Sequence, residues 1–203
     1  MKRLYENIEE INIKGSPAEL YTAVTSMDVT LQSIAEGTEH LFEIVSKYNA
    51  SNQGAQYNRM MEKIYQLRDT LLRSSEELNV MQNEVVRFMN KVFRYEDMSE
   101  AAPRPNSYMV QKTALNIENT GTAFVLTDML DVESALRDYS EAIYSQAVKF
   151  NDEKNRLESV WNDAQYKDFS EFVESVCKEI IDSLKVFDEY RTVLAEKIKE
   201  LQA

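Results

Sequence analysis

The sequence is poor in the residues that interrupt helices and in those that support catalysis. Its 203 residues include only four glycines and three prolines. An all-β fold is therefore disfavoured, because its turns consume both residue types. The only cysteine, Cys177, cannot form a disulfide within the chain. The only histidine, His40, cannot supply the two Glu-x-x-His pairs of a ferritin-like metal site.

Positive charge and long apolar runs are also scarce. Lys and Arg total 23 against 35 Asp and Glu, which gives a net charge of −12. Because an acidic surface repels phosphates and anionic membranes, we expect no nucleic-acid partner and no membrane insertion. Acids such as Glu6 and Glu9 follow Met1-Lys2-Arg3, so no signal peptide is expected. We expect a cytoplasmic protein, and export without a cleaved signal is the alternative left open.

Four stretches carry apolar residues at alternating four- and three-residue steps, which predicts helices with one buried face. Ser16-Pro17 followed by Glu19 is typical of a helix start. The predicted helices cover about residues 16–48, 55–96, 122–158 and 163–202. In the last of these the apolar stripe is Phe169, Val173, Val176, Ile180, Phe187, Tyr190, Leu194 and Leu201.

A linker with two prolines divides the predicted helices into two pairs, because closely spaced prolines end a helix. The chain is therefore divided into an N-terminal hairpin (1–98), a Pro-containing linker (99–107) and a C-terminal hairpin (108–203). Residues 1–15 and 108–121 show no decisive pattern. We expect an all-α fold in which two antiparallel helical hairpins stack into an elongated four-helix bundle.

The two hairpins resemble each other in sequence. The second and fourth helices align without a gap when shifted from Ala55 to Ala164, and both begin with Ala-Gln-Tyr. A serine interrupts both stripes, at Ser74 and Ser183. Heptad spacing alone would align any two amphipathic helices, but the shared turn residues favour duplication of a hairpin.

The turns carry fragments of a known motif. Trp161-Asn162-Asp163 has a tryptophan followed two residues later by aspartate, and Asn52-Gln53-Gly54 has only the glycine. A helical hairpin with Trp-x-Gly at its turn resembles the small Trp-x-Gly proteins of type VII (ESX-type) secretion systems. The resemblance implies hairpins that pair with each other. That family's export signal, Tyr-x-x-x-Asp or Glu beyond the second helix, is not found, because Tyr190 is followed by Leu194.

Few residues suggest chemistry. His40 shares a helix face with Glu36 and Glu43, but three ligands on one helix make a poor metal site, and a solvated face is expected. Cys177 lies beside the apolar stripe, as buried packing residues do. Gly-rich phosphate loops and nucleophile elbows are absent from the sequence. We therefore expect no catalytic, cofactor-binding or metal-binding residues and no enzyme activity.

Trp161 has two interpretations. It either plugs the open end of the bundle or is exposed as an anchor for a partner, a common role of interface tryptophans. The turn residues Trp161, Asp163 and Gly54 are the candidate partner-binding residues.

We expect a non-catalytic interaction protein that resembles type VII substrates or adaptors and acts by helix-face docking. The alternative is a bacterial or phage coiled-coil structural or assembly protein without a secretion role. Expected partners are proteins, either secretion machinery or another helical hairpin, and a homo-oligomer is left open.

Overall fold

A computed structural model describes residues 17–49, 51–95, 122–161 and 163–203, and these form a four-helix bundle. The helices are α1 (Pro17–Asn49), α2 (Ala55–Tyr95), α3 (Leu126–Leu157) and α4 (Ala164–Gln202). The predicted all-α bundle is confirmed for this part of the chain. The predicted linker at 99–107 and the undecided stretches 1–15 and 108–121 lie outside the described residues.

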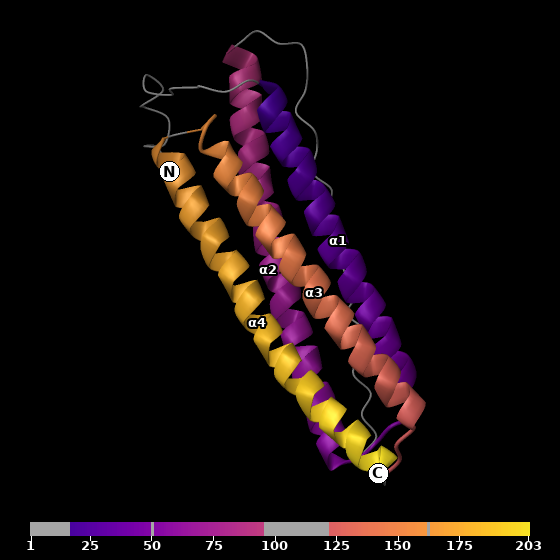
Figure 1. Ribbon diagram of the computed structural model, residues 1–203. Coiled ribbons are helices and arrows are strands. Elements are labelled where there is room, and N and C mark those ends of the chain that lie inside the picture. Colours follow the sequence, from indigo (N-terminus) through magenta and orange to yellow (C-terminus); the bar gives the residue numbers. More distant parts are fainter. Residues whose placement is uncertain (1–16, 50, 96–121, 162) are drawn as a thin grey trace.

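The four helices form a ring of neighbours in which each helix packs on two others (Figure 1). α1 packs on α2 and α3, and α4 packs on α3 and α2, so α1 and α4 are diagonal, as are α2 and α3. Neighbouring helices run antiparallel, while α2 and α3 run in the same direction (Figure 1). The end of α2 and the start of α3 therefore lie at opposite ends of the bundle.

One hydrophobic core runs through both hairpins, and the predicted stripes form it. Met27, Ile64, Ile143 and Phe187 represent the four helices in this core, and all are almost completely buried. The predicted stripe of the fourth helix extends slightly too far, because its last residue, Leu201, is exposed. Continuous burial along four helices is expected to supply most of the stability of such a bundle.

The start of α3 is later than predicted, at Leu126 instead of about residue 122. The reason is a short antiparallel β-bridge between Gln53 and Ala123, with hydrogen bonds of 2.9 and 3.0 Å. This pairing holds the chain before α3 extended, and Val125 has φ −108° and ψ 109°. A sequence pattern cannot reveal it, because the bridge joins residues from different hairpins.

A buried hydrogen bond fixes the register of α1 against α3. The Thr38 hydroxyl lies 2.9 Å from the Tyr139 hydroxyl and 2.7 Å from the Ile34 carbonyl oxygen. Since Thr38 donates its proton to Ile34, Tyr139 donates to Thr38. Burial raises the pKa of Tyr139 well above its usual range, so the phenol stays protonated.

Candidate functional site: the Trp161 turn

Trp161 lies in the turn between α3 and α4 and is buried, with 3% of its surface exposed. Its indole stacks on Phe88 of α2, with ring centroids 4.5 Å apart and planes 10° from parallel. Phe169 and Tyr166 of α4 contact the indole at centroid distances of 5.3 and 5.8 Å. A turn residue of the second hairpin thus packs directly on the first hairpin.

Asp163 holds this turn through one carboxylate oxygen. Its Oδ1 accepts a hydrogen bond from Trp161 Nε1 and another from the Tyr166 backbone N–H, both at 2.9 Å. The backbone of Asp163 is extended, with φ −134° and ψ −177°, as expected of an N-cap residue. One side chain therefore caps α4 and satisfies the buried indole N–H.

Tyr166 closes the turn from the other side. Its hydroxyl donates to the Lys154 carbonyl oxygen near the end of α3, at 2.9 Å. Burial raises the pKa of Tyr166. The turn is therefore a closed packing unit, in which both polar atoms of the aromatic residues have protein partners.

These contacts correct the hypothesis of an exposed anchor. An interface tryptophan must offer its ring to a partner, whereas Trp161 is covered by Phe88 and by the start of α4. The interpretation in which Trp161 plugs the bundle agrees with this geometry. Trp161 is therefore not exposed at the tip, and partner binding by this turn stays a prediction.

Gly54, the third candidate residue, lies at the opposite end of the bundle from Trp161 and Asp163 (Figure 1). Its φ of +148° is a conformation that residues with a side chain rarely adopt, and a Cβ there would lie 3.3 Å from the ring of Phe124. Its carbonyl oxygen accepts from the Asn58 backbone N–H at 2.8 Å, which begins α2. Gly54 thus has a backbone role in a different turn.

Asn52, which aligns with Trp161 under the hairpin repeat, is a site residue that sequence reasoning missed. It is buried, and its Oδ1 accepts from the Val125 backbone N–H at 2.8 Å. Its Nδ2 donates to the Tyr48 carbonyl oxygen and to Asp128, at 3.1 and 3.2 Å. The alignment of Asn52 with Trp161 was the sequence signal that could have identified it, because each of these two residues ties the turn of its own hairpin to the other hairpin.

The residues considered for chemistry do not assemble. His40 is exposed on α1 and Cys177 is buried on α4, and these two helices are diagonal. Burial raises the pKa of the Cys177 thiol to about 12, so it is protonated and a poor nucleophile. Within the described ranges, no three His, Cys, Asp or Glu side chains are grouped to hold a metal ion.

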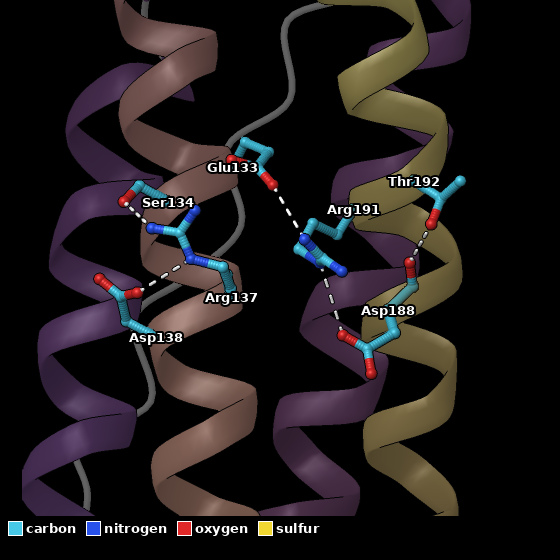
Figure 2. A network of polar contacts seen from close by, with 7 residues as sticks. All are labelled: Glu133, Ser134, Arg137, Asp138, Asp188, Arg191 and Thr192. Atoms are coloured by element: carbon cyan, nitrogen blue, oxygen red, sulfur yellow. Dashed lines mark hydrogen bonds and ion pairs between the residues drawn. The ribbon is translucent and has the colours of Figure 1, made fainter.

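A partly buried ion pair joins α3 to α4, and neighbouring ion pairs lie within each of these helices (Figure 2). Arg191 of α4 donates to Glu133 of α3 at 3.2 Å and lies 3.5 Å from Asp188 of its own helix. Arg137 lies beside Asp138 and Ser134 on α3. The pair of Arg137 with Asp138 is an ordinary helix-surface ion pair, whereas the less exposed pair of Arg191 with Glu133 ties α3 to α4.

None of the described helices has the length and apolar character needed to cross a membrane. No protein-family model matches the chain, and no curated protein or solved structure matches it significantly.

Proposed function

We propose that this protein is a non-catalytic helical interaction protein in which two hairpins of the type VII secretion kind are fused in one chain. The observation that supports the proposal is the stacking of the turn residue Trp161 on Phe88 of the other hairpin. Through this contact and the packing of their helix faces, the two hairpins of the chain form a single folded unit. The resemblance of Trp161-Asn162-Asp163 to Trp-x-Gly is consistent with it.

The packing also limits how such a protein acts. The inner stripes of all four helices are already covered within the chain. A partner therefore docks on outer faces, where several large apolar side chains are accessible. These include Val80 on α2 and Phe172 and Val193 on α4, which are 55%, 41% and 51% exposed. Single exposed apolar residues are common, and it is their placement on long, rigid helices that suits helix-face docking.

Export from the native host tests the secretion role. The protein is quantified in cells and in culture medium, in a strain with the type VII secretion ATPase and in one without it. A cytoplasmic enzyme measured in the same medium controls for lysis. We expect the protein in the medium only when the ATPase is present. An unchanged location in both strains would reject the secretion role and favour the alternative of a coiled-coil structural or assembly protein.

A further inference from the structure

The four helix–helix seams differ in how they are tied, and the α1/α3 seam is tied along its length. Besides Thr38 and Tyr139, the Tyr48 hydroxyl donates to Asp131 at 2.5 Å, and Ser51 donates to Asp128 at 2.6 Å. The backbone bridge at Gln53 adds two more hydrogen bonds at one end. The hydrogen bond between Thr38 and Tyr139 is buried, so breaking this bond between α1 and α3 would leave a buried hydroxyl unsatisfied.

The two hairpin seams are also tied. Between α1 and α2, buried Gln82 donates to the Val24 carbonyl oxygen at 3.1 Å, and the hydroxyls of Ser46 and Tyr65 are 3.1 Å apart. Between α3 and α4, Arg191 pairs with Glu133 near the end of α4 (Figure 2), and the Tyr139 ring packs edge-on against Phe187. Each hairpin is therefore held together by contacts well away from its turn.

The α2/α4 seam has weaker ties among the described residues. Arg73 and Glu179 pair across it at 2.5 Å, but their side chains are 60% and 40% exposed, and such pairs contribute little stability. Leu67 faces an open groove along α4, which is lined by Ser183 and Val186 among others. The stack of Phe88 on Trp161 fixes only the end of the seam near the α3–α4 turn.

Several buried polar atoms of the described residues lack hydrogen-bond partners, including Gln82 Oε1 on α2 and Arg191 Nε on α4, and the α2/α4 seam has one in Ser74. The Ser74 hydroxyl on α2 is completely buried and has no hydrogen-bond partner. Ser74 lies seven residues after Leu67 and next to Arg73, both of which are at the α2/α4 seam. The Ser74 hydroxyl makes no hydrogen bond while α2 and α4 are packed together, but it can bond to water once they separate. This gain lowers the free-energy cost of separating the two helices.

We propose that the native protein opens along the α2/α4 seam, while α1 and α3 stay paired as a spine. The opening begins between residues 67–74 of α2 and the groove residues 175–186 of α4, away from the stack of Phe88 on Trp161. It exposes core-facing side chains of α2 and α4 without unfolding the helices. Sub-global openings of this kind cost less free energy than complete unfolding. The inference depends on the contacts alone and is independent of a secretion role.

Thiol labelling under native conditions tests the opening. In a Cys177→Ala background, a single cysteine is placed at Val176 or at Val132, which are buried to the same degree. Val176 lies seven residues before Ser183, which lines the α2/α4 groove, and Val132 lies seven residues before Tyr139, which bonds α1. Circular dichroism confirms that each variant is folded. The labelling rate with a thiol reagent is then measured at increasing urea below the unfolding transition.

We expect the Val176→Cys protein to be labelled roughly tenfold faster or more, with a weaker dependence on urea, because the opening exposes less surface than global unfolding does. The Val132→Cys protein is labelled only through global unfolding, with the full urea dependence. Equal rates with the global urea dependence, or faster labelling at Val132→Cys, would overturn the proposal. Ser74→Cys repeats the measurement from α2 with a nearly isosteric change, and the same outcomes decide it.

Discussion

Asp163 is the residue whose replacement is most informative, because one carboxylate oxygen caps α4 and satisfies the indole of Trp161. Asp163→Ala removes both hydrogen bonds. Loss of an N-cap costs about 1 kcal/mol, and an unsatisfied buried N–H costs about 1–3 kcal/mol. The free energy of unfolding should therefore fall by about 2–4 kcal/mol, towards the lower value because this turn is partly accessible to solvent.

Two further variants separate the two hydrogen bonds. Asp163→Gly creates the Trp-x-Gly motif itself, and glycine costs only a few tenths of a kcal/mol as an N-cap, so about 1–3 kcal/mol should be lost through the indole. Asp163→Asn keeps an acceptor oxygen in place and should cost under about 1 kcal/mol. The expected order of stability is wild type, Asn, Gly, Ala.

Urea unfolding followed by circular dichroism measures these differences, and the fluorescence of Trp161 reports the turn in the same samples. All three variants should keep the slope of the unfolding transition and shift only its midpoint. The reasoning is refuted if Asp163→Ala is as stable as the wild type, or if Asp163→Gly is the most stable of the four proteins. The second result would mean that the turn is built for glycine and that the carboxylate contacts contribute nothing.

Three further predictions follow from the helices. Gly37→Ala should raise the unfolding free energy by about 0.5–1 kcal/mol, because the added Cβ meets side-chain atoms of α3 at 3.9 Å or more; a lower urea midpoint would contradict this. Thr38→Val should lower the unfolding free energy by about 1–3 kcal/mol, because it leaves the Tyr139 hydroxyl without its partner. Adding Tyr139→Phe should recover part of that loss. Purely additive losses in this double-mutant cycle would argue against the hydrogen bond. Stability should fall as pH rises above about 9, because burial raises the pKa of Cys177 from 9.0 to about 12 and the unfolded chain therefore releases the thiol proton first. Urea midpoints measured between pH 7 and 11 should fall less in Cys177→Ala than in the wild type. An equal fall in both proteins would contradict this prediction.

The sequence pattern was sufficient for much of the fold. Four- and three-residue spacing depends only on helix geometry, so stripe residues such as Phe169 and Ile180 were correctly assigned to the core. The start of α3 was wrong because the Gln53–Ala123 bridge joins segments distant in sequence. Pattern reasoning is blind to such pairings, since neither residue carries a periodic signal.

The candidate site was harder to predict for the same physical reason. Trp161 and Asp163 were correctly singled out as turn residues, but exposure depends on what covers a turn, and Phe88 comes from the other hairpin. Gly54 and Asn52 show the same limit. Gly54 was chosen because it matches the glycine of the motif, whereas the buried Asn52, two residues earlier, makes the contacts between hairpins.

The burial of Trp161 between the two hairpins is tested most directly by acrylamide quenching of the fluorescence of this single tryptophan in the native, full-length protein. A buried indole with 3% of its surface exposed should emit at shorter wavelength than in the urea-unfolded chain and should be quenched only weakly. Emission and quenching equal to those of the unfolded chain would show an exposed indole, and would contradict the packing of Trp161 on Phe88.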